Sequence, residues 1–278
     1  MNYRLFEPEE YDELPIPKLL YKYRDWNNKW HKTILIDQLL YLARPDSFED
    51  TLDCNIPVRY DLLTDKEIFQ IYFNESKNRY PYSDRKGHRK FAREWKSKKM
   101  LQDPIRIEEN REVSRKDFNN KYGVLCLTED PANIEMWDKY TANHTGFCIG
   151  FNGKEMLRDS SRFGLQGQVE YVDNLPIIRY SDDFVKRGVI NALHKLKKWS
   201  FEKEYRVSKV NYSPINDEWR SVPIESVYFL EIIFGKDMTE EHKHEIIELS
   251  NTKFPNVTFK QAKFDEIDNT KIVIENYF

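Results

Sequence analysis

The chain has 278 residues, enough for one large domain or two small ones. Its 44 Lys and Arg against 47 Asp and Glu give a net charge of −3, which argues against a protein that coats nucleic acid with its whole surface. An aromatic content of 14% is too high for a disordered chain, and nine glycines are too few to favour glycine-rich phosphate-binding loops.

The cysteines and the N-terminal sequence indicate the cellular environment. Cys54, Cys126 and Cys148 form no CxxC pair, so we expect no structural zinc site and no other metal site. No secretory signal and no apolar run long enough to span a membrane is visible. We therefore expect a soluble, reduced, cytoplasmic protein with no membrane partner.

The predicted elements give an α+β protein with a helical insertion. Residues 1–18 are acidic and proline-rich and are predicted to form an N-terminal arm before a single domain over 19–278. Within that domain, the segment 61–121 shows helical spacing and interrupts two sets of strands. Strands are predicted at 19–26, 39–45, 123–130, 146–151, 168–172, 201–210, 226–235, 257–264 and 271–278, and helices at 28–38, 183–199 and 239–251.

The first candidate site is the segment 198–207. Glu202, Glu204 and Arg206 alternate along the predicted strand, so their side chains should point the same way. Two carboxylates that face a cleft can stabilise a developing positive charge and position a nucleophile. The alternative is a solvated face of an edge strand.

Two further segments carry groups that suit a nucleotide. Trp137 and Tyr140 lie on a short predicted helix and His144 lies just before a buried strand, where they would suit a flat heteroaromatic ligand. Lys22 and Arg24 share one face of the first strand and could hold a phosphate. The alternatives are a turn histidine bonded to backbone and ordinary cations of an edge strand.

The fourth segment is strongly basic. Between Lys77 and Lys99 ten Lys or Arg face two acids, a net charge of +8. Such a segment could follow a nucleic-acid backbone, or it could be a solvated helix face balanced by acids elsewhere.

Taken together, these blocks resemble the bacterial family catalogued as domain of unknown function 2971. The resemblance rests on LYKYR, PDSFED, the WxxYxxxHxGxCIGF block at 137–151, the WxxExEYR block at 199–206 and a strand ending in IIFG, and extends over about 19–235. The layout is also similar to the ADP-ribosyltransferase fold, in which two small, mostly antiparallel sheets form a cleft and a late strand carries an ExE pair.

The resemblance implies an enzyme that cleaves NAD and transfers ADP-ribose to a protein or nucleic-acid acceptor, with a toxin or phage-defence effector as the biological role to consider. It implies that Glu204 bonds the ribose and Glu202 orients the acceptor. Lys22 or Arg24 would hold the pyrophosphate, and Trp137, Tyr140 and His144 would complete the NAD site. The alternatives are a non-enzymatic member of the fold that binds a nucleotide or a partner, and a nucleic-acid-binding module acting through Lys77–Lys99.

Overall fold

The computed structural model describes residues 16–158, 163–211, 213–254 and 256–278, and the α+β class is confirmed. Most of the N-terminal arm expected over 1–18 therefore lies outside the described residues. The strands are β1 (Leu19–Arg24), β2 (Leu39–Tyr41), β3 (Tyr122–Thr128), β4 (Phe147–Asn152), β5 (Gln166–Gln168), β6 (Glu170–Val172), β7 (His194–Leu196), β8 (Glu204–Val210), β9 (Ser221–Pro223), β10 (Phe229–Phe234), β11 (Thr258–Phe264) and β12 (Ile272–Asn276). The α-helices are α1 (Lys29–Ile36), α2 (Asp65–Arg79), α3 (Arg85–Ser97), α4 (Pro104–Lys121), α5 (Ile134–Tyr140), α6 (Gly153–Leu157), α7 (Phe184–Leu193), α8 (Asp217–Arg220) and α9 (Glu240–Lys253).

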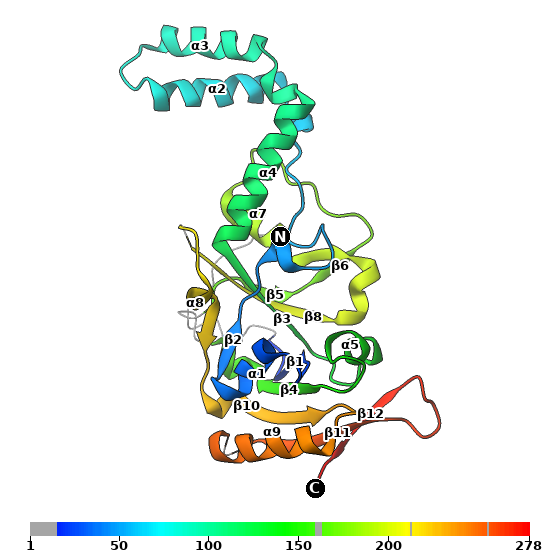
Figure 1. Ribbon diagram of the computed structural model, residues 1–278. Coiled ribbons are helices and arrows are strands. Elements are labelled where there is room, and N and C mark those ends of the chain that lie inside the picture. The colour runs from blue at the N-terminus through cyan, green and yellow to red at the C-terminus, as the bar shows by residue number, and fades with distance from the viewer. Residues whose placement is uncertain (1–15, 159–162, 212, 255) are drawn as a thin grey trace.

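One sheet of eight strands organises the described residues, in the order β12-β11-β10-β4-β1-β3-β8-β5. This differs from the two small sheets expected from the sequence, although two short pairs, β2 with β9 and β6 with β7, lie beside it (Figure 1). The strands are mostly antiparallel, as expected, and β10 with β11 is the parallel exception in the large sheet.

Within the large sheet, the pairing between neighbouring strands is shortest between β1 and β3. These two strands are paired at one described position, Tyr21 opposite Thr128, whereas β1 pairs with β4 over six positions and β3 with β8 over seven. The ladder therefore divides into a part ending at β1 and a part beginning at β3. Where strands diverge, polar side chains can reach a cavity between them.

Apolar side chains cover both faces of the sheet near β1 and β4. On one face the largest core cluster includes Trp26 against Phe147, and Phe254, directly after α9, stacked on Phe229 at 4.2 Å. On the other face α5 packs through Trp137, which is fully buried. This helix is thereby fixed beside the junction of β1 and β3.

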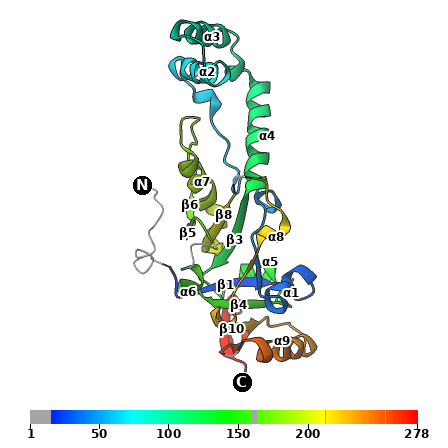
Figure 2. The same cartoon turned by 90° about the vertical axis from the view of Figure 1, so that its left-hand side faces the viewer.

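The insertion consists of α2, α3 and α4, and it extends away from the sheet. Both views show α4 rising from the start of β3, with α2 and α3 as a hairpin at its far end (Figures 1 and 2). A small separate core of Ile68, Tyr72 and Ala92 holds the hairpin together. Thr64 and Glu67 form a capping box at the start of α2, which explains where that helix begins.

Candidate functional site

A cavity of about 270 Å³ lies at the junction of β1 and β3. It is lined from β1 by Lys22 and Arg24, from β8 by Glu204, and from α5 by Tyr140. Residues far apart in the sequence are thus brought together, including four of the seven predicted site residues. Glu202, a fifth, lines the same cavity from the 3₁₀ helix η5 (Lys197–Glu202).

Three carboxylates converge on one lysine at the wall of this cavity. Lys195 Nζ lies 2.5 Å from Glu202 Oε2, 3.1 Å from Asp53 Oδ2 and 3.3 Å from Glu204 Oε2. All four side chains are buried. Three acids at this separation repel one another in a low-dielectric environment, and the ammonium in their midst offsets that repulsion.

A second cation completes the charge balance. Arg206, fully buried on β8, donates two hydrogen bonds to Asp53, at 2.6 and 2.7 Å, and one to Glu204 at 2.6 Å. The planar guanidinium fits the two oxygens of Asp53 in the bidentate arrangement that arginine favours. Arg206 therefore compensates the charges of Asp53 and Glu204 by direct contact.

The protonation states follow from these contacts. Burial by itself raises the pKa of Glu204, but Arg206 and Lys195 outweigh it and the pKa is lowered. Burial likewise lowers the pKa of Lys195, but Glu204 and Asp53 reverse the direction and raise it. At neutral pH Asp53 and Glu204 are therefore carboxylates, and Lys195 is an ammonium ion.

The two cations of β1 meet a different environment. Burial, together with the nearby charge of Arg24, lowers the pKa of Lys22 to about 8, while burial lowers that of Arg24 to about 10. Lys22 Nζ donates to the carbonyl oxygen of Cys126 on β3 at 2.5 Å. Neither ammonium nor guanidinium has an ion pair within the described residues, so both have charge to offer an anion.

Two aromatic rings flank the carboxylates. Tyr140 donates a hydrogen bond from its hydroxyl to Glu202 Oε1 at 2.7 Å, and 36% of the residue stays exposed. Trp199 lines the same cavity, and its indole N–H donates to Asp50 at 2.7 Å. Lys139 lies over both rings, 5.2 Å from the centre of Tyr140 and 4.1 Å from that of Trp199. The rings could accept a flat ligand if Lys139 moves.

Trp137 and His144 lie elsewhere. Trp137 packs edge-on against Tyr23 at 5.1 Å and donates to the carbonyl oxygen of Pro131, so both its ring and its N–H are used in the core. His144 stacks on Trp137 and places Nε2 2.7 Å from Asp138 Oδ1. Neither residue lines the cavity at the junction. Trp137 packs into the core, whereas Tyr140, the last residue of the same helix, lines the cavity.

The route of the chain around Glu202 also differs from the expectation. The strand predicted at 201–210 begins at Glu204, because Lys203 has a left-handed backbone with φ of 43° and ends η5. The helix predicted at 183–199 ends at Leu193, and the next residues form β7. Lys195 reaches the carboxylates from β7. Glu202 and Glu204 therefore meet through Lys195 rather than by alternation along one strand.

The sequence did not single out Asp53, Lys195 or Trp199. Asp53 closes a polar turn at 46–53, and its role depends on a contact with Arg206 across 153 positions of sequence. Lys195 falls inside what reads as a helix. Trp199 belongs to the WxxExEYR block, and Asp50, which accepts its indole hydrogen bond, belongs to the PDSFED block. Reading the two blocks together is therefore the signal that leads to both residues.

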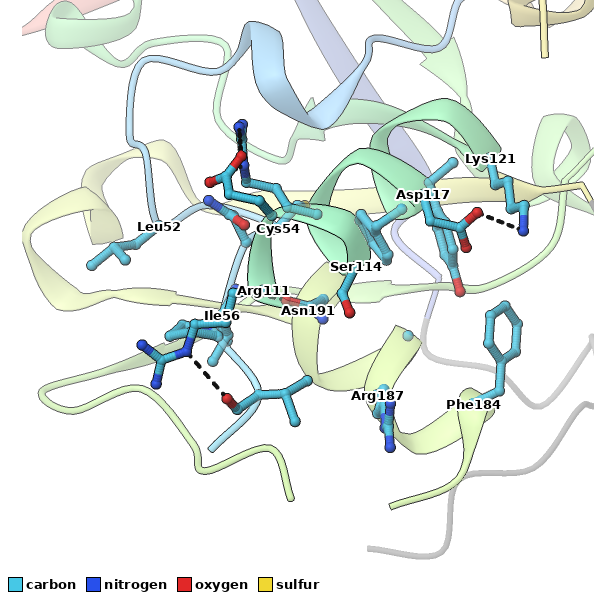
Figure 3. Close-up of a pocket in the computed structure, with 18 of the residues that line it drawn as sticks. Leu52, Cys54, Ile56, Arg111, Ser114, Asp117, Lys121, Phe184, Arg187 and Asn191 are labelled. Carbon is cyan, nitrogen blue, oxygen red and sulfur yellow. Dashed lines mark hydrogen bonds and ion pairs between the residues drawn. The ribbon is translucent and has the colours of Figure 1, made fainter. Parts of the chain in front are cut away.

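A larger cavity of about 410 Å³ lies between α4, α7 and the segment 52–58. Its charges are paired along α4: Lys121 with Asp117 at 2.7 Å, and Arg115 with Glu112 at 2.7 Å (Figure 3). None of the predicted site residues lines it. The smaller cavity, in which the carboxylates and the two free cations of β1 converge, is the better candidate for chemistry.

These features define an α+β protein with an ionised, carboxylate-rich cavity at the junction of two parts of a sheet. A family model described as "Protein of unknown function (DUF2971)" matches residues 136–207, which confirms that part of the resemblance over a shorter stretch than expected. The match includes Tyr140, Lys195, Glu202 and Glu204 but not β1. Comparison with curated proteins and with solved structures gave no significant match.

Two features are absent from the described residues. No helix among them combines the length and the apolar character needed to cross a bilayer. No group of three or more His, Cys, Asp and Glu side chains there is arranged to hold a metal ion.

Proposed function

We propose that the protein is an ADP-ribosyltransferase-like enzyme that cleaves NAD in the cavity between β1 and β8. The observation that carries the proposal is the convergence of Lys22 and Arg24 with Glu204 on one cavity, although the strands that hold them are 180 residues apart in sequence. An anion-binding pair and a carboxylate at either side of a narrow junction suit a ligand with a pyrophosphate at one end and a ribose at the other.

The roles follow from position and charge. Lys22 and Arg24 would hold the pyrophosphate, and Tyr140, with Trp199, would flank a ring. Glu204, ionised by its cationic neighbours, would accept a hydrogen bond from a ribose hydroxyl and stabilise the positive charge that develops on the sugar. A cavity of about 270 Å³ is at the low end for a small-molecule site, so it would enclose one end of the dinucleotide.

The proposed reaction is a substitution at the ribose. The bond from C1′ to the nicotinamide nitrogen breaks and its electron pair leaves with nicotinamide. A nucleophile of the macromolecular acceptor forms the new bond to C1′ and gives up its proton. Glu202, next to Glu204, would orient that nucleophile and take the proton.

The test is transfer of label from NAD to components of a cell extract. Glu204→Gln is the diagnostic variant, because it keeps the shape of the side chain and removes the charge. Glu231→Gln is the matched control, since Glu231 is equally buried, on β10, and is paired with Lys260. We expect transfer to fall at least about 100-fold in the first variant and to persist in the second. Absence of nicotinamide release and of transfer in the unmodified protein would refute the proposal.

One observation favours a second function, binding without turnover. Glu204 Oε2 already accepts from Arg206 and lies 3.3 Å from Lys195, so its charge is largely compensated before any ligand enters. A carboxylate held in this way stabilises a developing cation less than a free one. In this second function NAD, or another nucleotide, binds to Lys22 and Arg24 and dissociates unchanged.

A further inference from the structure

The α2–α3 hairpin is a projecting, cationic element that the proposed NAD site does not use. In both views it stands at the far end of α4, away from the sheet and the cavity at its junction (Figures 1 and 2). It includes most of the basic segment that runs from Lys77 to Lys99. Its function can therefore be considered separately from the chemistry of the cavity.

The apolar face of α3 is used inside the hairpin. His88 and Ala92 are buried, and Phe91 stacks on Trp95 at 5.6 Å, so residues at helical spacing pack toward α2. Tyr72 of α2 meets Trp95 at 6.0 Å from the other side. With its apolar face occupied, α3 turns its opposite face to solvent.

That opposite face is formed by cations. All of its basic residues are exposed, and they are Arg85, Lys86, Arg89, Lys90 and Arg93. Their spacing of three or four residues sets neighbouring Cβ atoms roughly 5–6 Å apart. Within the described part of the chain none of the five has an ion pair, whereas Lys96 and Lys98, at the end of the helix, are paired with Asp65 and Glu94.

The distribution of charge over the molecule is correspondingly uneven. With −3 over the whole chain and +8 over Lys77–Lys99, the remainder carries −11. A polyanion would thus be repelled by most of the protein and attracted by the hairpin.

We infer that the α2–α3 hairpin binds nucleic acid through its phosphate backbone, along the exposed face of α3. A row of unpaired, regularly spaced cations matches a row of phosphates, and guanidinium groups hold phosphate oxygens well. A membrane is disfavoured, because a helix that lies on a bilayer needs an exposed apolar face and that of α3 is packed against α2. The inference does not depend on NAD binding.

The test measures binding of the full chain to fluorescent 20-nucleotide RNA and DNA, single-stranded and duplex, over a range of salt concentrations. The diagnostic variant is Lys86→Glu/Lys90→Glu/Arg93→Glu. The control, Lys29→Glu/Lys263→Glu/Lys271→Glu, makes the same change of charge at exposed positions outside the insertion. Circular dichroism and thermal melting verify that both variants fold.

We expect the hairpin variant to lose at least tenfold in affinity and the control to lose much less. We also expect the slope of log affinity against log salt to fall by about 2–3, because each phosphate contact contributes about 0.9 on a duplex and about 0.7 on a single strand. The inference is overturned if the unmodified protein binds no nucleic acid at low salt, or if both variants bind equally. Binding to phosphatidylserine vesicles in place of nucleic acid would also overturn it.

Discussion

Lys22 joins β1 to β3 through its side chain at the point where the two backbones separate. Its ammonium donates to the carbonyl oxygen of Cys126, and the carboxylates of Glu204 and Glu202 act on it from the same cavity. Burial and the charge of Arg24 nevertheless lower its pKa to about 8. Lys22 is thus a cation held close to its point of deprotonation, and its charge should respond to modest changes of pH.

We expect the affinity for NAD or ADP-ribose to depend on pH because of Lys22. Below pH 8 the ammonium is charged and holds phosphate, and above pH 8 it loses its proton and this attraction. Affinity should therefore fall by up to about tenfold per pH unit between pH 8 and 10. Lys22→Arg should bind at pH 7 and lose the decline that begins near pH 8, because a guanidinium gives up its proton at a higher pH than an ammonium does. Calorimetric titration from pH 6.5 to 10 measures both, and identical profiles would show that Lys22 is not the group responsible.

At this scale the sequence predicted which residues line the cavity better than how they are arranged around it. Residue type and alternation were enough to single out Lys22, Arg24 and Glu204, all of which line the cavity. Asp53 and Lys195 could not be found in this way, because each acquires its importance from ion pairs formed across folded segments. Trp137 was predicted to line the ligand site but lies in the core. The sequence does not distinguish the two cases, because an aromatic residue near a charged motif can face either a ligand or the core.

At the scale of elements, a left-handed turn leads into β4. Ala142, Asn143 and His144 all have positive φ, between 51° and 64°, a conformation that costs most residues about 1–2 kcal/mol. Two backbone hydrogen bonds hold the turn in place: Asp237 N–H donates to the carbonyl oxygen of His144, and Gly235 N–H donates to that of Gly146. The segment after β10 thus supports the start of β4.

We expect Gly235→Ala to disrupt the contact between this segment and the turn before β4. An added Cβ would lie 2.1 Å from the carbonyl oxygen of His144 and 2.7 Å from that of Gly146, and backbone atoms cannot easily move aside. We expect a loss of about 3 kcal/mol or more in the free energy of unfolding. Gly167→Ala is the control, because its added Cβ meets only the end of the flexible Leu193 side chain, at 3.2 Å. Urea denaturation measures the free energy of unfolding of both variants. Equal stability of the two would contradict the close approach of Gly235 to the carbonyl oxygens of His144 and Gly146.

The elements themselves were largely predictable. Alternation located β8, and helical spacing located the insertion, because burial on one face leaves a repeat in the sequence. Apolar or aromatic runs located β1 and β10. The element boundaries near the cavity could not be predicted. The chain leaves α7 at Leu193 so that Lys195 meets the carboxylates from β7, and β8 starts only after the left-handed backbone of Lys203. Short strands such as β5 and β7 are too brief to show any period.

At the scale of the whole molecule, two separate features gather charged side chains. One is the narrow junction between β1 and β3, where free cations and ionised carboxylates face a common cavity. The other is the hairpin at the end of α4, which holds most of the segment Lys77–Lys99, and that segment carries +8 against −11 over the rest of the chain (Figure 1). The net charge of the whole chain indicates neither feature, because positive and negative side chains cancel in the sum. If both proposals hold, a nucleic acid held by the hairpin becomes a candidate acceptor for the reaction in the cavity.

The central claim is that β1 and β8 together form one nucleotide-binding site, and titration of NAD into the full chain tests it most directly. Arg24→Glu reverses a charge at the cavity, and Lys263→Glu makes the same reversal at an exposed position on β11. The account predicts that the unmodified protein and Lys263→Glu bind NAD equally, and that Arg24→Glu binds at least about tenfold more weakly. Failure of the unmodified protein to bind NAD, or equal binding by Arg24→Glu, would contradict it.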